Sequence, residues 1–532
     1  SELRILVTCY LLFMGFQPFG ATFISFSQTK DENAMRFAKT ITAEDAKKHL
    51  SVLASDEYEG RETGKEGQKK AAKYIAENFK RMGLSPTKDN NYLQEFPLRL
   101  RTPSAISIEV DEKEYENLKD FYVFPYGKDL ELEAKRILFL GYGISDEKYN
   151  DYKNRDVKGK IVLVLSGEPM SEDSVSFITG AKELSDWTTI YRKKTELAKS
   201  KGAEALLVVN TDFENNVKSL THYLTSPSMK LPQEKNSSQE EKKMPYMGIS
   251  MKMANNILAP KKLTVEGIRK TILSSKQSLS IEIKSSFELE IKNKEDKISS
   301  ENVLGMIEGS EWKDEAIFVT AHYDHLGVHE GKVFNGADDD GSGTVAVMEI
   351  AEAFARAKKA GFVPKRTMVF MTVAGEEKGL LGSSYYTDNP VFPIANTVCN
   401  LNIDMIGRTD DAHKDSINYL YIIGSDKIST ELHAINENAN STYTKLNLDY
   451  TFNDPKDPNR FYYRSDHYNF AEKGVPIIFY FNGIHEDYHK ETDEISKINF
   501  DLLAKRAQLI FYTAWETANR KTRIISDVSQ EK

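Results

Sequence analysis

Cysteine is scarce in this sequence of 532 residues, which contains only Cys9 and Cys399. Cys9 lies in an N-terminal segment that we expect to be removed, so no disulfide is expected within the mature protein. Cys399 lies in an apolar stretch, where we expect a buried, unreactive thiol rather than a nucleophile.

Acidic residues outnumber basic ones, with 80 Asp and Glu against 71 Lys and Arg. The formal net charge is -9 and the pI is near 5.8, and no stripe of Arg and Lys is interleaved with aromatic residues. Nucleic acid is therefore not expected as a partner. With 40% hydrophobic and 28% charged residues, the composition is ordinary for a globular protein with a large core. The length suits about two to four domains.

Long hydrophobic runs are missing, and the N-terminal one, residues 5–14, is short. It follows a start that contains Arg4, and residues 25–27 offer a small-x-small cleavage site, so we expect 1–27 to be a signal peptide. An uncleaved anchor or a buried helix is the alternative, but the run falls short of the ~20 residues of a spanning helix. Lipidation of Cys9 stays open. Export without a disulfide predicts a periplasmic or extracellular location in a bacterium.

The first part of the chain predicts helices, with a loop between them. From Thr42 to about Leu84 the pattern is helical, and Ala71, Ile75, Phe79 and Met82 share one face before Gly83 ends the run. Residues 51–64 are polar and interrupted by glycines, which predicts a loop before the helix that carries this face.

The middle of the chain has a different texture. Short apolar runs at 137–140, 161–165 and 205–209 predict strands, and one helix ends at Lys201-Gly202. The stretch 230–243 is charged and of low complexity, which predicts a surface loop. This block closes near Lys284, so we expect a module inserted into a larger domain.

The back half alternates strands and helices. Strands are predicted at 316–320, 367–373, 398–403 and 475–481, with a helix at 343–359. This alternation favours an α/β fold with a mostly parallel, mixed central sheet and helices on both faces. Ligands bind beyond the carboxyl ends of the strands in such sheets.

Potential metal ligands follow these strands or lie in a loop that leads into a helix. The set is His322, Asp339, Glu377, Asp404 and His489. Two imidazoles and three carboxylates suit a pair of zinc-like ions, with one carboxylate shared between them. Glu376 remains as a general base, and Asp324 is placed to orient His322. The set predicts hydrolysis with metal-activated water.

Each of these residues also fits a plain structural role when taken alone. The acidic run 338–340 resembles a solvated turn or a calcium loop, and Asp404 could pair with Arg408. Asp493 could serve as a hydrogen-bond acceptor behind His489. The neighbouring His325 and His329 are interpreted as ordinary polar residues. The metal site explains the whole set at once.

From Asn302 to about Ile498 the sequence resembles the M28 family of zinc peptidases, which includes bacterial aminopeptidases. The resemblance rests on the motifs at 321–327, 335–343, 374–383, 402–408, 464–467 and 488–489. It implies that Asp339 bridges two zinc ions. Of the other ligands, His322 and Asp404 would bind one zinc ion, and Glu377 and His489 would bind the second. It also implies that Glu376 is the base, that Arg464 contacts substrate and that Tyr488 helps polarise the scissile carbonyl.

The middle module resembles a protease-associated (PA) domain, through the motifs at 141–144, 156–162 and 201–205. The expected organisation is a signal peptide (1–27), a first part of the peptidase domain (28–130), an inserted PA domain (131–287), the main part of the peptidase domain (288–525) and a tail (526–532).

We therefore expect a zinc-dependent aminopeptidase that acts on peptides. A carboxypeptidase or dipeptidase on the same two-zinc centre is the first alternative. It would place Arg or Lys, rather than acids, near the free end of the substrate. A one-zinc glutaminyl cyclase and a non-catalytic binding scaffold are further alternatives. A calcium-stabilised structural protein is disfavoured, because two of the five ligands are histidines. The sequence leaves the oligomeric state open.

Overall fold

The computed structural model describes residues 29–87, 90–124, 126, 128–190, 192–232 and 244–529. The expected signal peptide with Cys9, and most of the predicted loop 230–243, lie outside these residues. Within the described ranges, no helix combines the length and apolar character needed to cross a membrane.

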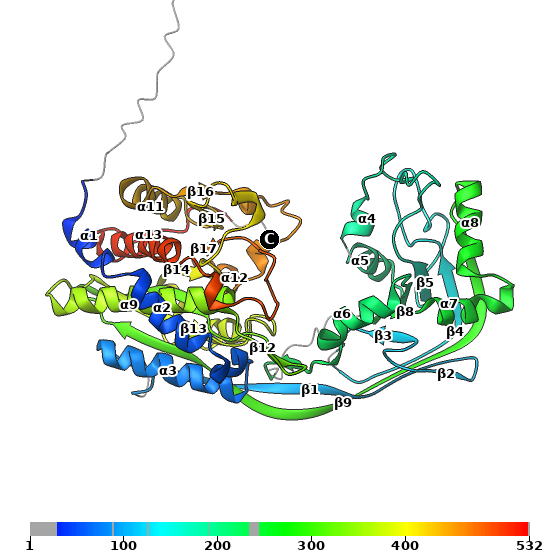
Figure 1. Ribbon diagram of the computed structural model, residues 1–532, viewed down its shortest axis with the longest axis horizontal. Helices are drawn as coiled ribbons and strands as arrows, with labels where there is room; N and C mark the ends of the chain where they lie inside the picture. Colours follow the sequence, from blue (N-terminus) through cyan, green and yellow to red (C-terminus); the bar gives the residue numbers. More distant parts are fainter. Residues whose placement is uncertain are drawn as a thin grey trace, which may run out of the picture.

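Two bodies are joined by a pair of very long antiparallel strands, β1 (Leu93–Val110) and β9 (Ser280–Ile307). These strands pair from Leu93 opposite Val303 to Val110 opposite Phe287, and they run along the base of the molecule from one body to the other (Figure 1). Because β9 is continuous across residues 287 and 288, the expected boundary there falls within a strand.

The larger body is built on a mixed sheet with the strand order β16-β15-β17-β14-β10-β13-β9. β10 is parallel to both β13 and β14, and β14 is parallel to β17, whereas β9 and β15 join antiparallel. The strands other than β9 are β10 (Trp312–His322), β13 (Arg366–Val373), β14 (Thr397–Ile403), β15 (Tyr419–Ile423), β16 (Asn447–Asp449) and β17 (Ile477–Phe481). A hairpin, β11 (Gly327–His329) with β12 (Lys332–Phe334), stands apart from this sheet.

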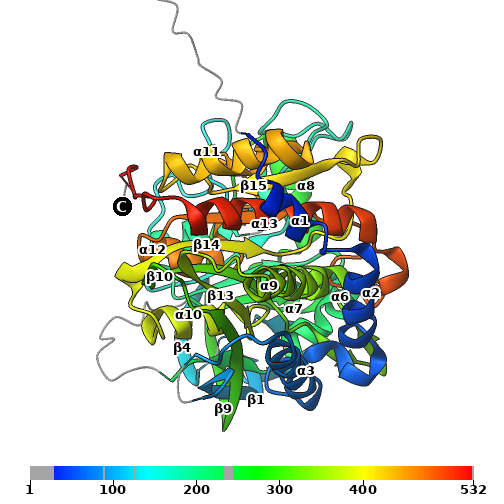
Figure 2. The same ribbon diagram turned by 90° about the vertical axis from the view of Figure 1, so that its left-hand side faces the viewer.

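Helices cover both faces of this sheet. Ile317 and Val319 of β10 pack into the core on one face, whereas Phe318 between them packs into the core on the other, as the pleat of a strand requires. One face carries α1 (Glu32–Ala38), α2 (Ala43–Leu53), α3 (Glu66–Met82), α9 (Gly343–Lys359), α11 (Thr430–Ala439) and α13 (Phe500–Asn519). Figure 2 shows α2 and α3 on the right and α12 on the left. The other carries α10 (Leu381–Asp388) and α12 (His467–Glu472).

The smaller body extends the strand order through β9-β4-β5-β6-β8-β3, with β4, β5, β6 and β8 parallel. Its strands are β2 (Lys113–Tyr115), β3 (Phe121–Val123), β4 (Leu130–Leu140), β5 (Ile161–Leu165), β6 (Ala205–Val209), β7 (Ser228–Lys230) and β8 (Tyr246–Ile249). Its helices are α4 (Asp186–Thr189), α5 (Lys193–Ser200), α6 (Phe213–Thr225), α7 (Met251–Leu258) and α8 (Val265–Ser275). A separate apolar core holds this body together.

The predicted fold class is confirmed, and several elements have the expected bounds. Strands 161–165 and 205–209 and helix 343–359 agree residue for residue. The predicted loop from residue 51 begins later, because α2 continues to Leu53. β10 is longer than predicted, so His322 is its last residue rather than one that follows it. Cys399 is fully buried, and burial raises the pKa of its thiol to about 12.

Candidate metal centre

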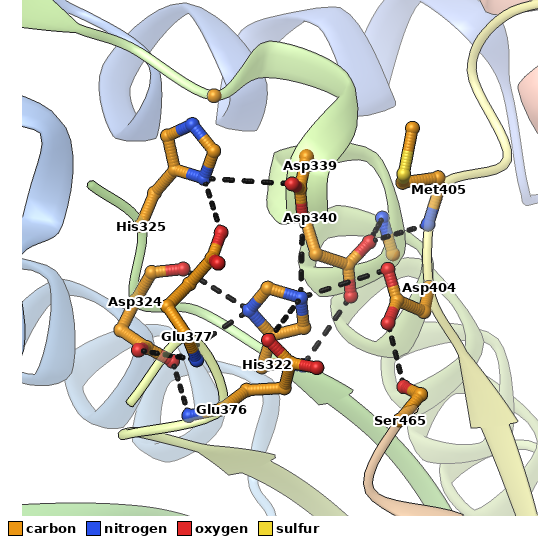
Figure 3. Close-up of polar contacts among 12 residues, drawn as sticks. His322, Asp324, His325, Asp339, Asp340, Glu376, Glu377, Asp404, Met405 and Ser465 are labelled. Atoms are coloured by element: carbon orange, nitrogen blue, oxygen red, sulfur yellow. Dashed lines mark hydrogen bonds and ion pairs between the residues drawn. The ribbon is translucent and has the colours of Figure 1, made fainter. Parts of the chain in front are cut away.

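The candidate ligands gather at the carboxyl ends of β10, β13 and β14. His322 ends β10, Asp404 directly follows β14, and Glu377 lies in the turn after β13. Asp340 holds the strand ends together, since its carboxylate accepts the backbone N–H groups of His322 at 3.3 Å and Met405 at 2.9 Å. Side chains distant in the sequence therefore face one another across a small space (Figure 3).

The first group of donors consists of His322, Asp339 and Asp404, whose ligand atoms all lie within 4.8 Å of one another. Nε2 of His322 is 3.3 Å from Asp339 Oδ1 and 3.6 Å from Asp404 Oδ1. Ser465 donates to the other oxygen of Asp404 at 2.6 Å, which leaves Oδ1 turned toward His322.

The second group shares Asp339 with the first. Its other oxygen, Oδ2, is 3.1 Å from His489 Nε2, and His489 Nε2 is 3.2 Å from Glu377 Oε2. His325, which the sequence interpretation treated as an ordinary polar residue, also belongs here: its Nδ1 is 2.8 Å from Glu377 Oε1 and 3.8 Å from Asp339 Oδ2. His325 follows His322, the last residue of β10, by only three positions, and this closeness in the sequence could have indicated its place in the cluster.

These residues fit a pair of divalent cations. Nε2 of His322 and Oδ2 of Asp339 are buried and have no hydrogen-bond partner. Unpartnered polar atoms at such depth are costly, and a bound cation would satisfy them. The donor set, imidazole nitrogens with carboxylate oxygens, is that of zinc sites. Asp339 directs one oxygen at each group, as a bridging ligand would.

The electrostatics of the cluster favour added positive charge. Burial alone would lower the pKa of His322, but Glu376 and Asp404 raise it well above its usual value. The pKa of Glu376 lies well above its usual range because the side chain is buried and Glu377 and Asp404 are close. Buried carboxylates in this number need cations nearby.

Asp324 connects the segments that carry the ligands. The sequence predicted that its carboxylate orients His322, but its backbone carbonyl lies nearer to the imidazole. Nδ1 of His322 is nearest to the backbone carbonyl of Asp324, at 3.1 Å, with its carboxylate at 3.6 Å. The carboxylate accepts hydrogen bonds from Thr63 Oγ1 at 2.8 Å and from the backbone N–H groups of Glu376 at 3.2 Å and Glu377 at 3.4 Å. Asp324 thus fixes both His322 and the turn that carries Glu376 and Glu377.

Two pairings that the sequence left open are replaced by others in the structure. Asp493 does not contact His489; it accepts the backbone N–H groups of Asp338 and Asp339, the latter at 3.0 Å, and so positions the shared carboxylate from behind. Arg408 pairs with Asp487 at 2.9 Å instead of Asp404, which leaves Asp404 without a cationic partner from that loop.

Arg61 is a buried side chain that supports the metal centre, and the sequence analysis did not identify it. Its guanidinium donates to the carbonyls of Tyr323 at 2.7 Å, Asn335 at 2.7 Å and Gly336 at 3.0 Å, and it also reaches Leu53. It therefore ties together the two loops that carry His322 and Asp339. No local pattern announces such a contact, because the acceptors are main-chain atoms far away in the sequence.

A pocket opens beside the cluster and contains the two remaining predicted residues. Arg464 and Tyr488 both line it, and Arg464 donates to the Tyr488 hydroxyl at 3.4 Å. The Tyr488 ring stacks on His489 at 3.9 Å. Three acids of the cluster line the same pocket (Asp339, Glu376 and Asp404), and its apolar walls are formed by Met405, Phe461, Phe479, Phe481 and Ile484.

Comparison with known families agrees with this geometry. Residues 302–514 match Peptidase family M28, and residues 136–257 match the PA domain. The chain therefore carries an M28 peptidase domain and a PA domain. The PA match lies within the smaller body, and the M28 match contains every predicted ligand.

Relatives of this chain include a "Probable zinc metalloprotease" of Pyrenophora teres f. teres, 27% identical over 47% of this chain and 58% of that protein. A "Probable glutamate carboxypeptidase" of Arthroderma benhamiae is 36% identical over 21% of this chain and 16% of that protein. The matches thus span less than two thirds of these relatives. An aminopeptidase from Aneurinibacillus sp. strain AM-1 shares the fold, with a TM-score of 0.56 and 18% identity over 93% of this chain and 98% of the other.

Proposed function

We propose that this protein is a zinc-dependent exopeptidase, and specifically an aminopeptidase that removes N-terminal residues from peptides. The observation that carries the proposal is the shared carboxylate: Asp339 directs Oδ1 at His322, at 3.3 Å, and Oδ2 at His489, at 3.1 Å. The match of residues 302–514 to peptidase family M28 and the zinc metalloprotease among the relatives support it.

His322 and Asp404 would hold one zinc ion, Glu377 and His489 the other, and Asp339 both. When bound, the ions supply the activation of a water molecule and the polarisation of the scissile carbonyl. The protein would contribute a fixed arrangement of donors, because Asp324, Asp493 and Ser465 hold the ligands from behind.

Glu376 would be the general base. Its Oε2 is 3.7 Å from His322 Nε2, so it borders the first group, and it also lines the pocket in which a substrate would lie. It takes a proton from the attacking water and delivers it to the nitrogen of the leaving peptide as the C–N bond breaks. Tyr488, with its hydroxyl held by Arg464, would donate to the developing oxyanion.

The pocket suits an apolar side chain at the end of a peptide, because Phe461, Phe479 and Phe481 line it. An aminopeptidase would bind the first side chain of its substrate there. A carboxypeptidase is the second candidate, favoured by Arg464 in the same pocket and by the glutamate carboxypeptidase among the relatives. In that case Arg464 would bind the free carboxylate.

Paired substrates test the proposal. Leucinamide and Leu-Gly-Gly should be hydrolysed from the amino end, whereas N-acetyl-Leu-Gly-Gly should not. Phenanthroline should abolish the activity and zinc should restore it. Release of the C-terminal residue from the acetylated peptide would favour the carboxypeptidase, and failure to cleave any of these substrates with zinc bound would refute both.

A further inference from the structure

A third group of potential metal ligands lies between helices of the larger body. It consists of His49 on α2 with Glu349 and Glu352 on α9, and the ligand atoms all lie within 4.8 Å of one another. The two helices pack side by side on one face of the sheet (Figure 2). Glu349 lies about 9 Å along α9 from its first residue, Gly343, so this group is distinct from the centre at the strand ends.

Glu349 is a buried carboxylate with a free oxygen. It is 2% exposed, and among the described residues its Oε1 has no hydrogen-bond partner. Oε1 faces His49 Nε2 at 3.8 Å, which is too far for a hydrogen bond. In the zinc-free protein this carboxyl keeps a proton, because burial, with Asp45 and Glu352 nearby, raises its pKa to about 8. A cation between Oε1 and Nε2 would replace that proton and satisfy the unpartnered oxygen.

His49 is held in an orientation that suits a metal ligand. Its Nδ1 lies 2.8 Å from the hydroxyl of Tyr74 on α3. When Nδ1 carries the proton and donates it to this hydroxyl, Nε2 keeps its lone pair and faces Glu349, as in metal-bound histidines. Burial lowers the pKa of the imidazole, so His49 is neutral at pH 7, the form that binds metal.

Glu352 completes the group from the same face of α9 as Glu349, since residues three apart in a helix are neighbours. Its carboxylate is paired with Arg356 at 3.1 Å and with Arg81 at 3.6 Å. Both arginine side chains are about half exposed, so these pairs are weak and can yield to a cation. Glu352 is partly exposed, which gives a cation access from solvent and room for a water molecule as a fourth ligand.

We propose that His49, Glu349 and Glu352 bind a third divalent cation of the zinc class, which fastens α2 to α9. One imidazole with two carboxylates is a zinc-type donor set, and the 3.8 Å between His49 and Glu349 is close to the 3.6 Å between His322 and Asp404. α2 precedes the PA match in the sequence and α9 follows it. The cation would therefore join the two parts of the peptidase body that the inserted module separates, and its role would be structural.

Zinc bound per chain tests the proposal, measured by equilibrium dialysis with free zinc raised until binding to the unaltered protein levels off. His49→Gln and Glu349→Gln each remove one donor, and each should bind one zinc ion fewer per chain than the unaltered protein. The matched control is His433→Gln, since His433 is a partly buried histidine on α11 whose Nδ1 contacts the Ser425 hydroxyl. It should keep the full number of ions. Equal zinc in the unaltered protein and either variant would overturn the inference.

Anomalous diffraction at the zinc edge locates the ion without any substitution. At the same free zinc, crystals of the unaltered protein should show a peak between His49 Nε2 and Glu349 Oε1, and no peak there would overturn the inference. Both variants should hydrolyse leucinamide at the rate of the unaltered protein. A loss of hydrolysis in step with the lost zinc would place the missing ion at the metal centre and would also overturn it. If the unaltered protein shows this peak but cleaves no substrate, the proposed function alone has failed.

Discussion

His325 holds Glu377 by a short contact, with 2.8 Å between Nδ1 and Oε1. His325 is fully buried, and the other oxygen of Glu377 faces His489 at 3.2 Å. An imidazole that fixes one oxygen of a carboxylate leaves the other oriented for a metal. His325 is therefore a positioning residue for the second donor group.

Replacing His325 with Gln should weaken zinc binding at the His489 side by about 10- to 100-fold, since outer partners of metal ligands carry effects of this size. Competition with a chromophoric chelator measures the zinc affinity. His329→Gln is the matched control, because Nε2 of His329 contacts the Leu326 carbonyl. Equal zinc affinity in both variants would remove His325 from the site.

Glu376→Gln should bind zinc normally and lose turnover of leucinamide by at least about 100-fold, the usual contribution of a general base. Zinc content and kcat are measured on the same sample. Undiminished turnover would show that another group moves the proton.

Asp339→Asn should lower zinc occupancy in both groups together, because a neutral amide is a poor bridge between cations. Asp404→Asn and Glu377→Gln are the controls, and each should weaken mainly one of the two sites. Zinc bound per protein molecule, titrated at fixed free zinc, separates these patterns. Loss of a single ion in Asp339→Asn would contradict the bridge.

Arg61→Ala should destabilise the protein by at least about 3 kcal/mol, because it leaves several buried carbonyls without donors. Chemical unfolding of the zinc-free protein measures this effect. The control is Arg81→Ala. The Arg81 side chain is 55% exposed and forms an ion pair with Glu352 at 3.6 Å, so its loss should lower the free energy of unfolding by less than about 1 kcal/mol. Equal effects in the two variants would mean that Arg61 does not hold the ligand loops.

Glu349 should make stability depend on pH. Burial, with Asp45 and Glu352 nearby, raises its pKa from 4.5 to about 8. The folded state then keeps a proton that the unfolded state loses, so stability falls as pH rises toward 8, by up to about 1.4 kcal/mol per pH unit. His49, whose pKa burial lowers from 6.5, acts in the opposite sense only at lower pH.

Other groups also titrate between pH 6.5 and 8, among them Lys194, whose pKa burial lowers to about 7, so only a comparison with Glu349→Gln isolates the contribution of Glu349. The unfolding free energy of Glu349→Gln should change less with pH in that window than that of the unaltered protein. Parallel slopes for the two proteins would contradict the raised pKa.

Much of the fold was predictable because parallel strands that are buried on both faces have continuous apolar sequences, as at 161–165 and 398–403. The convergence of His322, Glu377 and Asp404 followed from the rule that such strands end at one edge. Arg61 and Asp493 escaped prediction because they bind main-chain atoms brought close only by the tertiary fold. β9 was not foreseen as one strand, since its exposed middle is highly charged.

Anomalous diffraction at the zinc edge, from crystals of the zinc-loaded protein, measures the central arrangement most directly. The account predicts two peaks about 3.5–4 Å apart, one between Asp339 and the pair His322 and Asp404, the other between Asp339 and the pair Glu377 and His489. A single peak, or two peaks that do not share Asp339, would contradict it.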